Sequence, residues 1–449
     1  MHRSGWKTAL AALLMQTCLF AGTAFASESR DDAPAAAASL LRGVQNALVN
    51  GKVLFDTRLR YEFVSQGGVS NANAATARIR LGYQTAFWHG FAVLVEAEAT
   101  GGINQAHNYR VPGLPDTPQD KAVVADPDNA EINRANLRYA NEDLGIRGNL
   151  YRQRMILGDS RWVGNVGWRQ NEQTFDAARI DLTPANVLPG LEAMYAYIWQ
   201  TNRIFGLWSG RDVAGDAAGK WISGSHIVNV AWNDLGPLDI TLYYYGFDNR
   251  SPDPLGSNSN NIGFHAAGRH GVGEDVELHY RAEYNRQISG FENPNDYAAN
   301  YFHVTGGTRW KSLRLTAALE NLGADGGFAV QSPYGTNHKF NGWADLFLAT
   351  PTFGNTDGRA AGLRDLYIVL GTDLPLNIPA AVVYHKFWSI EGPVGDLGNE
   401  IDLSLSRKLG QHLTLLAKAA FYWGAGSGDA PLPVKPDTSK FWLQATWRF

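Results

Sequence analysis

The sequence predicts an all-β fold, a transmembrane antiparallel β-barrel of about 18 strands with long extracellular loops and short periplasmic turns. Three observations support it: an amino-terminal export signal, repeated alternation of apolar and polar residues, and a last alternating strand that stops on Phe449. Aromatic residues make up 12% of the chain, yet the mean hydropathy is only −0.25. A barrel accounts for both values, because only alternate strand residues face lipid and aromatic rings gather at the membrane interfaces.

The amino terminus has the parts of a secretory signal peptide. Arg3 and Lys7 precede an apolar run at residues 9–25, and the small residues Ala24 and Ala26 mark a cleavage site before Ser27. The only cysteine, Cys18, lies within that segment, so the mature chain offers no disulfide and no thiol ligand. The expected segments are a signal peptide at residues 1–26, a short periplasmic segment at residues 27–50 and an outer-membrane barrel at residues 51–449.

Alternation with a period of two recurs along the chain. In residues 55–63 one face carries Phe55, Leu59 and Tyr61, and the other face is mostly charged. A soluble half-buried sheet gives this pattern too, so alternation alone leaves an exported soluble β protein open. A closed barrel pairs all strand edges, which a bilayer demands because it has no water for unpaired backbone groups. Similar runs occur at residues 76–87, 276–285 and 313–320.

The last strand is the most specific local signal. Residues 441–449 alternate apolar with polar side chains and end on Phe449, as in the assembly signal of outer-membrane barrels. We therefore expect the barrel-assembly machinery to read this strand and outer-membrane lipid to surround the barrel. The expected protein is a monomer in the outer membrane of a Gram-negative bacterium. Long polar connections, expected to be extracellular loops, lie at residues 101–131, 205–222, 248–261, 288–299, 321–341 and 424–438.

The composition excludes several classes of function. A net charge of −4 and a pI near 6.3 give no electrostatic footprint for nucleic acid. The 11 histidines are scattered without a His-Glu-x-x-His pattern, so we expect no metal and no cofactor. A barrel-embedded lipid hydrolase would need a Ser/His pair near one rim, and Ser225-His226 is interpreted as a chance neighbour pair. The chain is therefore predicted not to be an enzyme.

Arginine dominates the basic residues, with 28 Arg against 11 Lys. A lumen rich in guanidinium groups favours anions, because these groups stay charged and bind carboxylates through two hydrogen bonds. Charge reversal at Arg78, Arg80 and Arg169 is therefore expected to shift ion selectivity. The alternative is that the charges pair across strands and only fill a wet lumen. The candidate pore-lining residues are Arg58, Arg60, Arg78, Arg80, Arg134, Arg138, Arg152, Arg154, Arg161, Arg169, Arg179, Arg281 and Arg314, and their candidate acidic partners are Asp56, Glu62, Asp159, Asp176, Glu283 and Glu320.

Several stretches match a known family, at residues 51–62, 76–85, 134–176, 338–345 and 362–367. The sequence resembles the alginate-export porins, particularly the broad and mostly uncharacterised part of that family, although Tyr151 stands where glycine is expected. The resemblance implies a barrel of about 18 strands and passive passage of a polar anionic solute, with an anionic polysaccharide as the first candidate. The alternatives are a general porin or an uptake porin for small organic anions, followed by a lipid hydrolase.

Overall fold

The chain divides into two compact units, Met1–Asn50 and Gly51–Phe449, which are described separately. In the first unit, the Ala-rich segment Ala35–Val49 forms helix α2. The expected signal peptide, residues 1–26, lies outside the described residues. Of the helices in the described ranges, none is both long and apolar enough to cross a membrane. The structure, a computed structural model, describes residues 35–103, 108–185, 188–206, 219–233, 235–251, 255–348, 360–391, 395–425 and 435–449.

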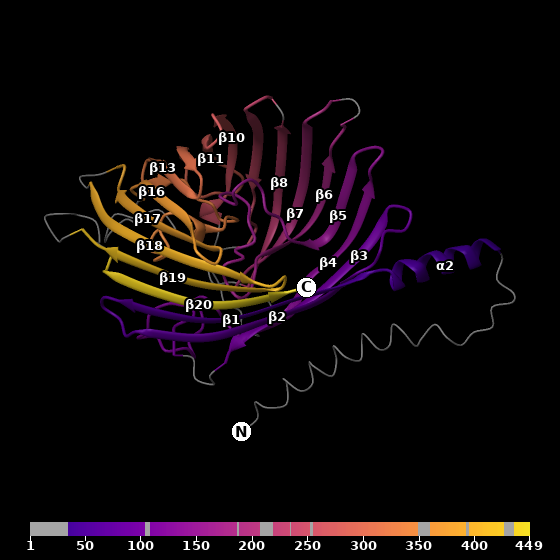
Figure 1. The fold of residues 1–449 in the computed structure, drawn as a ribbon, viewed down its shortest axis with the longest axis horizontal. Helices are drawn as coiled ribbons and strands as arrows, with labels where there is room; N and C mark the ends of the chain where they lie inside the picture. Colours follow the sequence, from indigo (N-terminus) through magenta and orange to yellow (C-terminus); the bar gives the residue numbers. More distant parts are fainter. Residues whose placement is uncertain are drawn as a thin grey trace, which may run out of the picture. The chain divides into compact units, whose positions relative to one another are not determined.

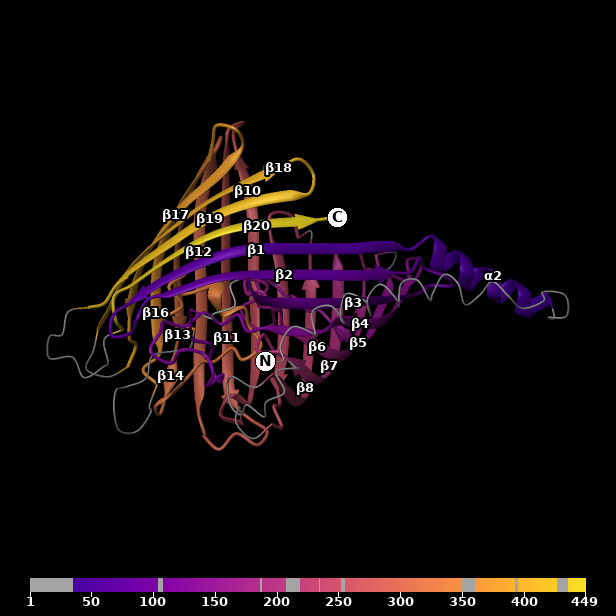
Figure 2. The same ribbon diagram turned by 90° about the horizontal axis from the view of Figure 1, so that it is seen from below.

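The second unit is a closed antiparallel sheet of 18 strands, which confirms the predicted fold class (Figures 1 and 2). Each strand pairs with the strand before it and the strand after it, and the ring closes where β1 pairs with β20. The strands are β1 Lys52–Gln66, β2 Ala72–Gln84, β3 Phe91–Gly102, β4 Asn129–Asn141, β5 Ile146–Gln153, β6 Thr174–Leu182, β7 Leu191–Asn202, β8 Lys220–Trp232, β9 Asp239–Phe247, β10 Ser259–Val272, β11 Val276–Ser289, β12 Ala298–Trp310, β13 Leu313–Leu322, β16 Leu363–Leu374, β17 Ile378–Trp388, β18 Asp396–Leu409, β19 Leu413–Trp423 and β20 Thr438–Arg448. A separate two-residue hairpin, β14 Ala324–Asp325 and β15 Phe328–Ala329, and two short 3₁₀ turns, Leu255–Ser257 and Asn337–Lys339, lie between strands.

The closing pair joins the first strand of the barrel to its last. Phe55 and Phe449 exchange two backbone hydrogen bonds of 3.1 Å, and their rings stack with centroids 5.1 Å apart. From there the ladder of β1 and β20 continues to Gln66 and Thr438. Its backbone groups are therefore paired, as a bilayer requires. That an assembly machinery reads this strand stays a prediction.

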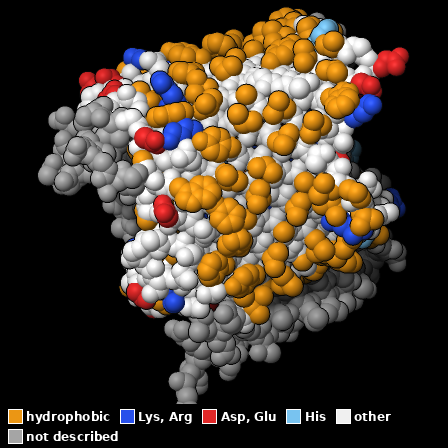
Figure 3. Space-filling model, turned by 60° about the vertical axis from the view of Figure 1, so that its left-hand side comes forward, with side chains coloured by type: hydrophobic (Ala, Val, Ile, Leu, Met, Phe, Trp, Pro, Cys, Tyr) orange, Lys and Arg blue, Asp and Glu red, His pale blue; other side chains and the backbone are white. Residues whose placement is uncertain are grey.

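The two faces of the sheet differ as the alternation predicts. On β1 and β2, Leu59 is 52% exposed and Ile79 is 47% exposed, whereas the intervening Arg58 and Arg78 are buried. Figure 3 shows one face of the molecule, where apolar side chains form a broad band and charged side chains lie near its margins. Since only the interior of the ring can bury arginine here, the apolar face is the one that contacts lipid.

The two ends of the barrel also differ. At one end, short turns join neighbouring strands, for example residues 273–275 between β10 and β11, where Gly273 has a φ of 66° that suits glycine. At the other end the connections are long, including residues 103–128 and 323–362. Because outer-membrane barrels have short periplasmic turns and long extracellular loops, we call these the periplasmic end and the outer end.

One long connection was not predicted. After Gln153 the chain leaves the sheet and returns only at Thr174, so residues 154–173 form a loop and not part of a strand. Its backbone turns sharply at Ser160 and Val166, which have φ values of 74° and 49°. In the sequence, Tyr151, Gln153 and Met155 alternate less cleanly than the residues of other strands, because the strand ends at Gln153 and the loop begins.

Candidate functional site

Three connections from the outer end fold into the barrel, and they are named inner loop A (residues 108–128), inner loop B (residues 154–173) and inner loop C (residues 330–348). Inner loop A packs Tyr109 and Val124, both fully buried, against inward residues of β1 and β2 such as Val64 and Ala74. Inner loops B and C share one apolar cluster with the inward residues of other strands. The interior of the barrel is therefore partly filled at this level.

Inner loop B is held against the wall by apolar contacts. Met155, Leu157, Trp162 and Val163 of the loop are buried with wall side chains from several strands. Each such side chain stabilises the packing by about 1.5–3 kcal/mol when it is fully buried. Loop B is therefore a fixed part of the lumen. The wall residues of this cluster include Phe175, Met194, Ile198, Trp221, Ile227, Tyr243, Tyr245 and Phe247.

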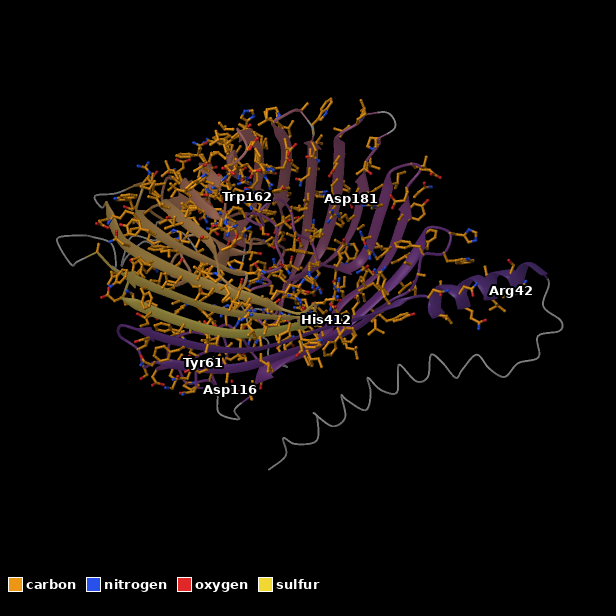
Figure 4. The ribbon with its side chains drawn as sticks, viewed as in Figure 1. Arg42, Tyr61, Asp116, Trp162, Asp181 and His412 are labelled. Atoms are coloured by element: carbon orange, nitrogen blue, oxygen red, sulfur yellow. The ribbon has the colours of Figure 1, made fainter. Side chains whose placement is uncertain are left out.

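Inner loops B and C are also joined to each other and to the wall. The Gly164 amide donates a 2.8 Å hydrogen bond to the carbonyl of Tyr334 in loop C. A side chain at position 164 would collide with Thr336, so this approach requires glycine. Trp162, which lies inside the ring of strands (Figure 4), donates from Nε1 to Glu283 of β11 at 2.8 Å.

The basic wall of the lumen consists of the inward arginines of β1 and β2. Arg58 Nη1 donates to the carbonyls of Gly167, Trp168 and Arg169 at 3.0–3.1 Å, so this guanidinium binds the backbone of inner loop B. Arg60 Nη2 also donates to Trp168, at 2.5 Å. These two arginines therefore hold the loop and are not open to a solute. Their neighbours are paired, Arg78 with Asp56 and Arg80 with Glu98 and Glu172.

Arg169 is the point at which all three inner loops meet the wall. Its guanidinium lies 3.2 Å from Glu62 of β1, 3.9 Å from Asp126 of loop A and 2.9 Å from Asp345 of loop C. Arg169 as a whole residue is only 6% exposed. Burial opposes its charge, but the carboxylates, Glu62 foremost, raise the pKa of Arg169 above its usual value. This one cation therefore binds four segments of the chain together.

The opposite wall is acidic, and inner loop B bridges to it. Arg161 of the loop lies 2.9 Å from Glu320 of β13, while Arg281 of β11 lies 2.8 Å from Asp159 and 2.5 Å from Glu283. The acidic partners predicted from the sequence thus all have arginines within ion-pair distance. Sequence reasoning missed other carboxylates, namely Glu96, Glu98, Asp126, Glu172, Asp345, Asp365, Glu400 and Asp402. Those on strands could have been found from the same alternation, which places Glu96 and Glu98 on one face.

His338 of inner loop C contacts inner loop B. The His338 ring stacks on Trp168 with centroids 4.5 Å apart, and His338 Nδ1 lies 2.5 Å from Asp345 Oδ1. Lys418 of β19 approaches His338 Nε2 at 3.2 Å. Burial and the nearby Lys418 together lower the pKa of His338 to about 3, against the opposing effect of Asp345. Burial alone would raise the pKa of Asp345, but His338, Lys440 and Arg169 lower it well below its usual range.

We predict that acid loosens inner loop C through His338. An exposed histidine gains a proton near pH 6.5, whereas His338 in the packed loop stays neutral down to about pH 3. The open state therefore binds more protons between these values, so the packed state loses stability as pH falls below 6.5, by up to about 1.4 kcal/mol per pH unit. Hydrogen exchange of residues 330–348, corrected for the intrinsic pH dependence, should show this loss. His338→Phe should flatten the slope, and an unchanged slope in that variant would refute the assignment.

A cavity of 1160 Å³ lies in the lumen on the periplasmic side of inner loop B. Its lining runs from turn residues Glu142 and Asn233 to loop residues 154 and 156–158. Among its arginines, Arg134 pairs with Glu96 at 2.7 Å, whereas Arg138 forms no ion pair with a described carboxylate and donates from Nη1 to Gln84 Oε1 at 2.6 Å. The cavity is lined by the arginines Arg134, Arg138, Arg147, Arg154 and Arg179, and by the carboxylates Glu142, Asp181 and Glu192.

The remaining candidate residues lie in different parts of the barrel. Arg179 pairs with Asp181 of the same strand at 2.6 Å (Figure 4 labels Asp181). Arg152 pairs with Asp176 at 2.8 Å. It lies opposite Ala135 of β4 in the sheet and does not line the cavity. Arg314 lines a second cavity of 490 Å³ near the periplasmic end. That cavity also contains Arg269, Glu277, His279 and Arg309.

Ser225 and His226 do not form a catalytic pair. Ser225 is fully buried, and its Oγ lies 3.0 Å from the hydroxyl of Tyr334 and accepts a 2.8 Å hydrogen bond from the Asp248 amide. His226 lies on the exposed face, where its Nδ1 is 2.9 Å from the hydroxyl of Tyr195. Consecutive strand residues point to opposite faces, so the two side chains cannot act on one substrate.

Solved structures with the same fold identify the architecture. OccAB2 of Acinetobacter baumannii is similar at a TM-score of 0.66 and 14% identity, over 90% of this chain and 99% of that chain. OpdK of Pseudomonas aeruginosa, solved with vanillate, is similar at a TM-score of 0.62 and 13% identity, over 90% and 99%. OccAB3 of A. baumannii gives a TM-score of 0.66 at 12% identity, over 90% and 100%. These are outer-membrane porins with 18-stranded barrels.

No protein-family model matches the sequence, and no curated protein matches it. At such low identity the solved structures establish the fold and not the solute. The fold and the apolar outer surface together place the barrel in the outer membrane of a Gram-negative bacterium, as predicted. The alginate-export resemblance is not confirmed.

Proposed function

We propose that this protein is a passive outer-membrane channel for the uptake of small organic anions. One observation carries the proposal: the lumen on the periplasmic side of the inner loops is lined by more arginines than carboxylates. Since guanidinium groups stay charged and form paired hydrogen bonds with carboxylates, such a lining attracts organic acids. Several weak contacts allow an anion to leave as well as to enter.

The inner loops support a small solute over a polymer. Fixed apolar packing and the contacts of Arg169 hold the three loops across the interior. The cavity of 1160 Å³ beside them is close to the upper size of pockets that hold small molecules, about 1000 Å³. The solved neighbour OpdK contains vanillate, a small aromatic carboxylate, which supports the same class. Passage of an anionic polysaccharide, the first expectation from the sequence, has no comparable support.

We also propose that the channel is monomeric and not an enzyme. A passive pore takes its direction from the solute gradient and needs no cofactor or catalytic group. The solved neighbours are channels, which supports the absence of an enzymatic activity. Assays of the purified protein for lipid hydrolysis would then give only background rates.

The proposal predicts block of the channel by a small aromatic carboxylate. In planar bilayers, sodium vanillate on the outer side should interrupt the chloride current at millimolar concentration, because a carboxylate competes for the lumen arginines. Vanillyl alcohol, which keeps the ring without the carboxylate, is the control and should not block. Block by oligouronates at lower concentration than by vanillate would instead favour the polysaccharide.

A further inference from the structure

Basic side chains lie on the lipid-facing surface of the barrel at its outer end. Arg286 of β11, Arg364 of β16 and Lys386 of β17 each stand within the last few residues at the outer end of their strands. In the sheet, β12 and β13 separate β11 from β16, and β17 follows β16 directly. With about 4.8 Å between neighbouring strands, the four strand steps from β11 to β17 separate Arg286 from Lys386 by about 19 Å across the sheet.

The exposure of their neighbours shows that these three side chains face lipid. Tyr284 and Ile288, on the same face of β11 as Arg286, are 40% and 38% exposed. Leu366 and Tyr384 stand in the same relation to Arg364 and Lys386, at 41% and 42%. The residues between them point inward and are buried, namely Asn285, Gln287, Asp365, His385 and Phe387.

Two of these cations have no acidic partner among the described residues. Arg286 Nη1 donates to the amide oxygen of Asn300 at 2.9 Å. Arg364 Nε donates to the amide oxygen of Asn321 at 3.1 Å. Neutral amides orient the guanidinium groups without cancelling their charge, and each guanidinium retains further N–H donors. Lys386 differs, because its Nζ lies 2.6 Å from Asp396, which is 54% exposed.

Tyrosines mark this level as the membrane interface. The hydroxyls of Tyr244, Tyr284 and Tyr384 each donate a 2.8 Å hydrogen bond to an asparagine on the next strand. Such rings favour the boundary where the ring meets lipid and the hydroxyl meets water. The asparagines are Asn260, Asn300 and Asn399, and Asn300 is the one that also holds Arg286.

We propose that Arg286, Arg364 and Lys386 form a binding site for the phosphate groups of a phosphorylated glycolipid in the outer leaflet. An unpaired guanidinium at the lipid boundary attracts an anion that is itself anchored in the membrane. Phosphate fits best, since arginine binds it through paired, charge-assisted hydrogen bonds. The acyl chains of the same lipid then cover the exposed apolar residues below, such as Ile368 and Val382. This site is on the outside of the barrel, so it is independent of the proposed solute pathway.

The test is a lipid titration of the full mature protein in detergent. Diphosphoryl lipid A is added to the wild type and to the triple variant Arg286→Gln, Arg364→Gln, Lys386→Gln, and bound lipid is counted by native mass spectrometry. The control variant Lys52→Gln, Arg407→Gln, Lys408→Gln removes the same charge near the periplasmic end. Each surface cation without an acidic partner contributes about fivefold to affinity for an anionic lipid, so the loss of Arg286 and Arg364 should make the triple variant bind about 25-fold more weakly. The control variant should bind as the wild type does.

Three further outcomes decide against the site. Equal binding by the triple variant would remove these side chains from lipid recognition. Equal binding of lipid A stripped of its phosphates would show that the acyl chains alone account for the contact. Displacement of lipid A by millimolar inorganic phosphate would assign the site to free phosphate. Folding of every variant is checked beforehand by its heat-modifiable migration in gels.

Discussion

Reversing two charges in the periplasmic cavity is expected to abolish the anion preference of the channel. The variant is Arg138→Glu with Arg147→Glu, both of which line the cavity. When one of these charges is reversed, the interaction energy of an ion about 4 Å away changes by about 2 kcal/mol in water, before screening by salt is counted. We expect the ratio of chloride to potassium permeability, measured from reversal potentials in planar bilayers, to fall by about tenfold.

The control for this variant reverses two charges outside the cavity. Arg286→Glu with Arg407→Glu makes the same change in net charge on the lipid-facing surface of β11 and β18, and neither residue lines the cavity. Its permeability ratio should stay near the wild-type value. If both variants shift the ratio equally, the net charge of the protein and not the lumen lining controls selectivity.

Removing the charge of Arg169 is expected to release the inner loops. Arg169→Gln leaves Glu62, Asp126 and Asp345 without the cation that they share. Loss of one partner from a buried ion pair costs about 3–5 kcal/mol, because the remaining charges stay buried. We expect a larger single-channel conductance with frequent current fluctuations, since the loops no longer hold one arrangement across the lumen.

An exposed ion pair provides the comparison for Arg169. Arg147 and Glu142 lie 3.1 Å apart with side chains that are 60% and 75% exposed, and such a pair contributes about 0–1 kcal/mol. Arg147→Gln should therefore leave the unfolding temperature and the current noise nearly unchanged. A quiet channel of wild-type conductance in the Arg169→Gln variant would show that the apolar cluster alone holds the loops.

The strands of the barrel could be predicted because alternation is a local property. On β1 the pattern separates the exposed Leu59 from the buried Arg58, and the same holds for Ile79 and Arg78 on β2. The carboxylates expected to partner the arginines also followed from alternation where they lie on strands. For this reason the fold class, the closed ring and most lumen-facing strand residues were accessible without a structure.

The inner loops could not be predicted, because their contacts are far apart in sequence. Arg169 meets Glu62 across 107 positions and Asp345 across 176 positions. No periodicity links such residues, so the sequence predicts Arg169 to line the pore, whereas in the structure it joins the loops to the wall. Arg78, Arg80 and Arg169 are buried and paired, so ion selectivity cannot be tested cleanly at these positions. Arg138 and Arg147 line the cavity and are the better choice. Charge reversal at the first three would disturb packing before it changed selectivity.

Passage of small organic anions through a basic lumen is tested directly by a reversal potential. The purified wild-type protein is placed in a planar bilayer between unequal concentrations of potassium chloride, and then of potassium vanillate. The structure predicts preference for chloride over potassium in the first case and a measurable vanillate current in the second. Preference for potassium in both salts would contradict anion selectivity, since arginines would then not control passage through the lumen.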